Sequence, residues 1–263
     1  MKSTAIRPPA VAGMFYPADP DELHQMVSGY LKEAEQTGPA PKAVIVPHAG
    51  YVYSGPIAAS AYARLAQARG RITRVVLLGP SHRIPFRGLA LSSAKTFLTP
   101  LGSVPLDQTA RAALKDLSQV QVTDQAHALE HSLEVQLPFL QEVLGDFTLV
   151  PLAVGDASPE DVGEVLDKLW GGPETLIVIS SDLSHYHDYK AARRMDEATS
   201  AAIEELNPNA ISYDQACGRI PIAGLLLTAK KRGLRAKTID LRSSGDTAGS
   251  KDEVVGYGAY VFE

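Results

Sequence analysis

Short apolar runs rich in β-branched residues alternate along this chain with longer amphipathic stretches. The pattern is typical of parallel strands joined by crossover helices, because strands buried on both faces are apolar throughout. We expect strands at residues 43–47, 74–79, 147–154, 175–180, 235–241 and 254–262. We expect helices at residues 20–35, 56–68, 108–117, 133–143, 159–169, 189–206 and 221–231. The sequence therefore predicts an α/β fold with a mostly parallel central sheet flanked by helices.

The ends of these elements carry local signals. Pro56, Pro159 and Pro221 stand at expected first helical positions, where proline loses no intrahelical hydrogen bond. Ser54 or Gly55 would cap the first of these helices. The segment 254–262 alternates and contains two glycines, which indicates an antiparallel edge strand. Since no linker divides the 263 residues, we expect one domain spanning 1–263.

Composition excludes several functions. The formal net charge of −5 and the dispersed Lys and Arg residues argue against nucleic-acid binding. No apolar run approaches the length needed to cross a bilayer, and the N-terminus lacks a signal-type apolar region. The single cysteine cannot form an intrachain disulfide. We therefore expect a cytoplasmic protein that binds neither nucleic acid nor membrane, while its oligomeric state stays open.

Two histidines follow predicted buried strands directly. His48 comes after an Ala-Val-Ile-Val-Pro run, and Gly50 then lets the chain turn. His82 lies just beyond Gly79-Pro80, which ends another apolar run. Because open α/β sheets build their sites at the carboxyl ends of strands, the two imidazoles could share one cation through neutral nitrogens. The alternative is that each is a hydrogen-bonded structural histidine.

Cys217 is the candidate for a third ligand. It precedes a predicted helix and lies close to Arg219, an environment expected to lower the pKa of a thiol. A lone cysteine is more often a small buried hydrophobe, so spacing alone leaves both interpretations open.

Other polar groups would serve acid–base chemistry. Asp182 and His185 follow the strand at 175–180, so the carboxylate could orient the imidazole, or His185 could move a proton itself. Glu130 and His131 are expected at a helix start capped by Ser132, where they either line the site or serve the structure.

The remaining histidines and aromatic residues have weaker contexts. His24 and His127 are expected on the surface. Phe15, Tyr51 and Tyr53 either wall a pocket for a flat ligand or pack in the core.

Taken together, these runs closely resemble the Memo family, called AmmeMemoRadiSam system protein B in prokaryotes. The motifs, which span nearly the whole chain, are RPPAVAGMFYP at 7–17, PHAGYVYSG at 47–55, GPSH at 79–82, EHSLE at 130–134, SSDLSH at 180–185 and CGR at 217–219. The resemblance implies the fold of class III extradiol ring-cleavage dioxygenases, in which strand-end histidines and a carboxylate bind non-haem Fe(II).

For this chain the resemblance implies a metal site of His48, His82 and Cys217, with His185 as the acid–base histidine and Asp182 close by. A thiolate in place of a carboxylate shifts metal preference toward copper or zinc, with iron still an option, and makes the centre oxidisable. The resemblance also implies radical-SAM and AMMECR-type proteins as partners in prokaryotes, and phosphorylated receptor peptides in animals.

The sequence thus supports two functions of different class. The first is a metal-dependent, dioxygenase-like oxidoreductase in which His185, supported by Asp182 and His131, transfers protons on a small substrate. The second is a non-enzymatic module that binds a peptide or partner in the same cleft, with basic residues available at Arg83, Arg87 and Arg219. A zinc hydrolase fits the ligand set but lacks a substrate handle in the sequence.

Overall fold

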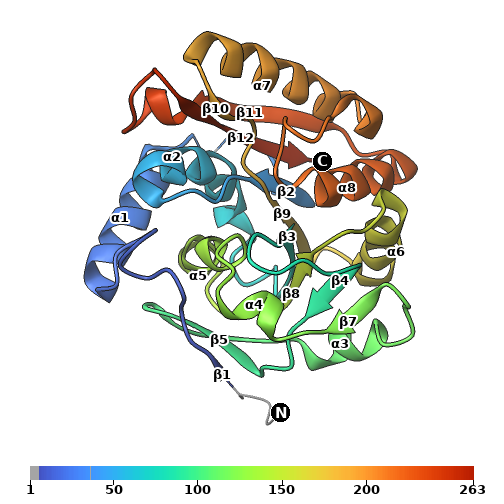
Figure 1. The fold of residues 1–263 in the computed structure, drawn as a ribbon. Coiled ribbons are helices and arrows are strands. Elements are labelled where there is room, and N and C mark those ends of the chain that lie inside the picture. Colours follow the sequence, from blue (N-terminus) through green and yellow to red (C-terminus); the bar gives the residue numbers. More distant parts are fainter. Residues whose placement is uncertain (1–5, 36) are drawn as a thin grey trace.

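A computed structural model describes residues 6–35 and 37–263 of the chain. Four parallel strands form the centre of a nine-stranded sheet in the order β2-β9-β3-β8, and they span Ala43–Val46, Thr175–Ser180, Arg74–Pro80 and Thr148–Val154 respectively. All four are almost completely buried, as their apolar sequences require. The predicted α/β fold with a parallel centre is confirmed (Figure 1).

The flanks of the sheet are mixed. Beyond β2 lies the antiparallel strand β12 (Val254–Phe262), which pairs on its far side with β11 (Ala236–Ser243). The short strand β10 (His185–His187) pairs with the first residues of β12. Beyond β8 lie β4 (Leu89–Leu91), which is antiparallel to it, and then β7 (Val120–Val122), parallel to β4. A separate three-stranded sheet holds β1 (Ile6–Arg7), β5 (Thr96–Thr99) and β6 (Gly102–Pro105).

The prediction of β12 as an edge strand is wrong, although its antiparallel direction is confirmed. Tyr260 pairs with Ile45 on one side and with Thr238 on the other, so β12 is interior. Its glycines permit close approach, since a Cβ at Gly256 would lie 2.0 Å from the Asp196 carboxylate. A glycine in a strand can indicate that another group packs closely against the backbone, and this is as common a reason for it as an edge position.

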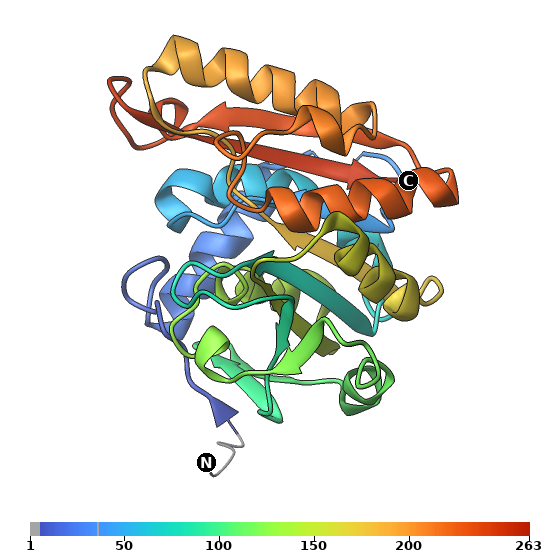
Figure 2. The ribbon, with the colours of Figure 1, turned by 45° about the vertical axis from the view of Figure 1, so that its right-hand side comes forward.

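Helices cover both faces of the sheet (Figure 2). One buried apolar cluster lies on each face. One face packs against α1 (Pro20–Glu33), α2 (Tyr51–Tyr62) and α5 (Leu137–Leu144). The other packs against α3 (Gln108–Ala113), α6 (Pro159–Leu169), α7 (Tyr189–Glu204) and α8 (Arg219–Arg232). The short helix α4 (Gln125–Ala128) and four single-turn or short 3₁₀ segments complete the described chain. Within the described residues, every helix is too short or too polar to span a membrane.

Helix starts agree with the sequence where the cap is local. Ser158 and Asp161 form a reciprocal capping box at α6, which begins at Pro159 as predicted. By contrast, α2 begins at Tyr51 and not at Pro56, because the Tyr51 amide donates to the distant Phe15 carbonyl and Gly50 takes the cap position. Pro56 therefore lies inside the helix. Similarly, α8 begins at Arg219, ahead of Pro221.

Candidate metal centre

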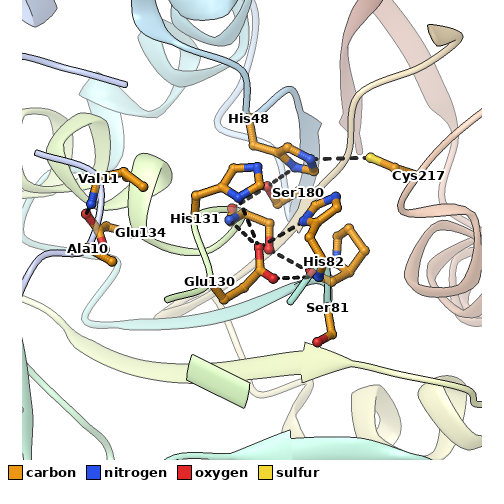
Figure 3. A network of polar contacts seen from close by, with 12 residues as sticks. Ala10, Val11, His48, Ser81, His82, Glu130, His131, Glu134, Ser180 and Cys217 are labelled. Atoms are coloured by element: carbon orange, nitrogen blue, oxygen red, sulfur yellow. Dashed lines mark hydrogen bonds and ion pairs between the residues drawn. The ribbon is translucent and has the colours of Figure 1, made fainter. Parts of the chain in front are cut away.

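Three imidazoles converge at the carboxyl edge of the parallel strands (Figure 3). His48 follows β2 and His82 follows β3, while β9 lies between these two strands. The third, His131, comes from the loop after α4. One nitrogen of each ring lies within 4.8 Å of the others, a spacing at which one ion can reach all three.

The tautomer of His48 follows from its neighbours. Its Nδ1 lies 2.9 Å from the Ser180 hydroxyl, which itself donates to the Ser132 carbonyl at 2.6 Å. Gln136 donates to the same hydroxyl oxygen at 2.8 Å. Because the Ser180 proton is already used, His48 Nδ1 must carry the hydrogen in its own contact. The Nε2 atom of His48 then carries no hydrogen, and its lone pair can bind a metal.

Glu130 sets the tautomer of His82 in the same way. Its carboxylate accepts the His82 ring Nδ1–H at 2.9 Å, the His82 amide at 2.6 Å and the Ser132 amide at 2.9 Å. Burial alone would raise the pKa of Glu130, but these hydrogen bonds outweigh burial and hold the pKa at about 2. A permanently ionised Glu130 leaves His82 Nε2 free, as in a carboxylate–histidine–metal arrangement.

His131 supplies the third imidazole of this cluster. We call His48, His82 and His131 the donor group, since each offers one nitrogen to a metal. The His131 ring stacks on His82 with centroids 4.6 Å apart and meets His48 edge-on at 5.4 Å. On its other side Phe15 packs at 4.7 Å. Burial, followed by the charge of His82, lowers the pKa of His131 despite the opposing effect of Glu130. Within the described chain its Nδ1 makes no hydrogen bond, although it lies 3.4 Å from Glu130 Oε1.

Cys217 lies directly beside this cluster. Its Sγ is 3.3 Å from His48 Nε2 and also accepts the Asp182 amide at 3.3 Å. Burial and then the Asp182 charge raise the pKa of this thiol to about 12. The prediction that the pKa of Cys217 is lowered is therefore wrong for the protein without a bound cation. The effect of desolvation on the thiol pKa outweighs that of the helix N-terminus. The Arg219 guanidinium lies 5.3 Å over the Tyr213 ring. The neutral thiol therefore donates to His48 Nε2 in this state.

Asp182 contacts His48 through both of its oxygens. Oδ1 accepts the His48 amide at 2.7 Å, and Oδ2 lies 3.9 Å from His48 Nε2. Burial raises the pKa of this carboxyl. His185 lies on β10, partly buried, and no hydrogen bond in the described chain joins it to Asp182. The geometry thus places Asp182 with the His48 ligand position, while its support of His185 stays a prediction.

Two further sequence predictions are wrong. His127 was expected at the surface but is buried, with Nε2 at 2.9 Å from the Ala90 carbonyl, and burial lowers its pKa to about 4. Ser132 does not cap a helix, because its hydroxyl donates to the Pro80 carbonyl at 2.9 Å. His24 is exposed, as predicted, and pairs with Glu142.

The aromatic residues divide between core and cleft. Tyr51 is buried and its hydroxyl donates to the Val135 carbonyl at 2.6 Å, which makes it a core residue. Phe15 and Tyr53 line a cavity of about 250 Å³ that Tyr51 also borders, and Phe15 contacts His131 as described above. Phe15 therefore borders both this cavity and the histidine cluster.

A second carboxylate of the same motif fastens the N-terminal segment. Glu134 is fully buried and accepts hydrogen bonds from Arg7 at 2.5 Å and from the Tyr16 hydroxyl at 2.6 Å. The amides of Ala10 and Val11 also donate to it, at 2.7 and 3.0 Å. We call these five residues the Glu134 anchor. It explains the 7–17 motif as a structural feature that brings Phe15 to the cluster.

The residues that orient the ligands were not identified from the sequence. Ser180 and Gln136 fix the His48 ring, yet a serine at a strand end and a glutamine just before an apolar helix carry no distinctive spacing. The signal available in the sequence was a polar residue next to an apolar run. The structure shows that both side chains are completely or almost completely buried, where a polar group needs a partner.

Comparison with known proteins places the chain in a family. The sequence model described as Memo-like protein matches residues 7–261. A MEMO1 family protein of Aquifex aeolicus is 37% identical over 268 residues, covering 98% of this chain and 99% of its own length. One from Ignicoccus hospitalis is also 37% identical, with 98% of both chains covered.

A solved structure supports the fold alone. An uncharacterized protein from Escherichia coli K12 aligns with a TM-score of 0.54 at 14% identity, covering 82% of this chain and 98% of its own. The family match and the relatives extend over nearly the whole sequence and include every residue of the donor group. This chain belongs to the Memo family.

Proposed function

We propose that the cleft is a transition-metal centre in which His48 and His82 are ligands and Cys217 supplies a third. The observation that carries this proposal is the pair of fixed tautomers. Ser180 and Glu130 occupy the Nδ1 atoms of the two rings, so both Nε2 atoms offer lone pairs on the same side. His48 Nε2 contacts the thiol of Cys217, which is itself a potential metal ligand, so the converging ring nitrogens suit a shared ion.

The position of Cys217 supports its assignment as a ligand. Sγ touches the very nitrogen of His48 that would bind the ion. A cation there would replace the thiol proton and favour the thiolate, reversing the effect of burial on the pKa. Two imidazoles and a thiolate suit copper or iron, with zinc as an alternative. His131 is the competing third ligand, since its nitrogen lies within the same 4.8 Å group.

The chemistry we propose is redox or oxygen chemistry on a small substrate. A bound iron or copper ion would supply Lewis acidity and electron transfer. His185, partly buried on β10, would accept or donate the substrate proton, while Asp182 holds the His48 backbone in place. His82 keeps 30% of its side chain exposed, so the donor group is open to a small molecule from solvent.

X-ray absorption of the Cu(I)-loaded and Fe(II)-loaded protein tests the ligand set. We expect a sulfur scatterer in the wild type that disappears in Cys217→Ser, and a spectrum retaining sulfur in His131→Ala. A sulfur-free first shell in the wild type, combined with loss of binding in His131→Ala, would instead assign a three-histidine site. Oxygen uptake with small phenolic substrates, compared between wild type and His185→Gln, then tests the reaction class.

One observation favours the second function, a non-enzymatic peptide-binding module in the same cleft. The Arg83 side chain is exposed, and its charge contributes to lowering the pKa of His131 after the effects of burial and neighbouring groups. A cation at the mouth suits an anionic partner group. Cys217→Ser separates the two functions, because it removes a metal ligand and leaves Arg83 in place. Binding of a phosphopeptide that survives this substitution would favour the module.

A further inference from the structure

A groove outside the metal centre lies between α3 and β7. Its cavity has a volume of about 360 Å³. Leu91, Val120 and Val122 give it an apolar lining, and Arg111 and Lys115 add two cations. None of the described residues that line it is acidic. The groove therefore combines apolar surface with uncompensated positive charge.

Both cations are available for a ligand. In the described chain the Arg111 guanidinium reaches only the Ser93 carbonyl, at the long distance of 3.5 Å, and the Lys115 ammonium makes no ion pair or hydrogen bond. The nearby carboxylate of Asp107 is committed to Arg74 at 2.7 Å. Positive charge in this groove is thus not neutralised by the protein itself.

The strand beside the groove is the last strand of the sheet. Among the strands of residues 6–35 and 37–263, β7 pairs with β4 alone. Leu89 N donates to Gln119 O and Thr123 N donates to Leu91 O, so alternate residues of β7 face β4. The intervening Val122 directs its N–H and C=O away from β4, and its side chain is 57% exposed. This is an open edge that can accept another strand.

We propose that this groove binds an extended acidic segment of a partner protein, which adds to β7 as a strand and pairs its carboxylates with Arg111 and Lys115. Charge complementarity selects the occupant, because the lining offers cations and no competing acid. A second copy of this chain fits poorly, since pairing two β7 edges brings like charges together. The chain runs from β7 through α4 to Glu130 and His131, so the partner would pair with the strand that begins this segment.

A labelled synthetic peptide tests the charge requirement. The probe is a fluorescein-labelled seven-residue peptide in which Glu alternates with Val, and binding is measured by fluorescence anisotropy. We expect the double variant Arg111→Glu/Lys115→Glu to lose about tenfold in affinity, from two ion pairs reversed. Lys237→Glu, which reverses an exposed cation on β11, is the matched control and should leave the affinity unchanged. A peptide with Lys in place of Glu should not bind.

Hydrogen exchange tests the strand addition on the unmodified protein. The peptide should slow amide exchange in the segment that contains Val122, and Val122→Pro, with folding verified by circular dichroism, should weaken binding. Undetectable binding at millimolar peptide overturns the proposal. So does charge-dependent binding without slower exchange at β7, which would indicate an anion site only. Self-association of the wild type that Val122→Pro abolishes would also overturn it, by identifying a second copy as the occupant.

Discussion

Glu130 and Glu134 belong to one short motif, yet they sit in networks with opposite properties. Glu134 is surrounded by donors from the N-terminal segment, and both of its oxygens are occupied. Glu130 binds the His82 ring and leaves a nitrogen of that ring unused on the far side. The Glu134 anchor is closed, whereas the network of Glu130 ends at His82 Nε2, which makes no hydrogen bond within the described part of the chain.

The difference shows how a structural carboxylate can be told from a site carboxylate. A closed network stabilises the fold, because removing any member leaves a buried group unpaired. An open network also satisfies its buried carboxylate, but it leaves lone pairs directed at a common point, where a ligand can complete it. Substitution of Glu134 should therefore change stability alone, whereas substitution of Glu130 should change both stability and metal affinity.

The largest effect is expected at the anchor. Glu134→Ala should lower the free energy of unfolding by about 3–5 kcal/mol, because it leaves Arg7 buried without its counter-ion. Urea denaturation monitored by circular dichroism measures the loss. Glu142→Ala, at a partly exposed pair with His24, is the control and should cost less than about 1 kcal/mol. Equal losses in the two variants would refute the assignment of Glu134 as an anchor.

The next largest effect is a loss of stability at acid pH that depends on Glu130. Its pKa is about 2 in the folded protein against an ordinary 4.5, so the ionised carboxylate stabilises the fold fully above pH 4.5. That stability, about 3 kcal/mol at most, is lost as the pH falls from 4.5 toward 2. Urea titrations at a series of pH values should show this slope in the wild type and a shallower slope in Glu130→Gln. Identical slopes would contradict the ionised state of Glu130.

The same substitution sharpens the comparison through metal binding. Glu130→Gln should weaken metal affinity by about 10–100-fold, because the amide holds the His82 tautomer less firmly than a carboxylate does. Competition titration with a chromophoric chelator measures the change with Zn(II). Glu142→Gln serves as the matched control and should leave the affinity unaltered. An affinity that survives in Glu130→Gln would mean that His82 is oriented without this carboxylate.

The smallest effect is expected at Ser180. Ser180→Ala removes the acceptor of His48 Nδ1–H and should weaken metal affinity by about tenfold, the low end for groups that orient ligands. Ser200→Ala provides a matched control, since Ser200 is also buried and bonds the Tyr260 hydroxyl at 2.8 Å. We expect this control to lower stability without changing metal affinity. A similar loss of affinity in both variants would point to general loosening of the fold.

The sequence predicted those parts of the fold that depend on local patterns. Apolar β-branched runs located the four central strands within a residue or two, and Ser158 with Pro159 located the start of α6. The start of α2 depends on the Phe15 carbonyl, and the interior position of β12 depends on two partner strands. Such long-range contacts leave no local signal in a single sequence.

The site was predictable to a similar degree. Strand-end positions brought His48 and His82 together in the prediction as they are in the structure. The burial of His127 and the raised pKa of the Cys217 thiol depend on desolvation by surrounding chain, which spacing does not reveal. The roles of Ser180 and Gln136 also depend on distant parts of the chain. Ser180 can orient His48 because its hydroxyl donates to the Ser132 carbonyl and accepts from Gln136.

Elemental analysis tests the central claim most directly. The protein is purified anaerobically under reducing conditions without added metal, as wild type and as His48→Ala, Cys217→Ser and the distant control His24→Ala. We predict near-stoichiometric iron or copper in the wild type and in His24→Ala, and its loss in both site variants. A metal-free wild type that also takes up no added Fe(II), Cu(I) or Zn(II) would contradict the account.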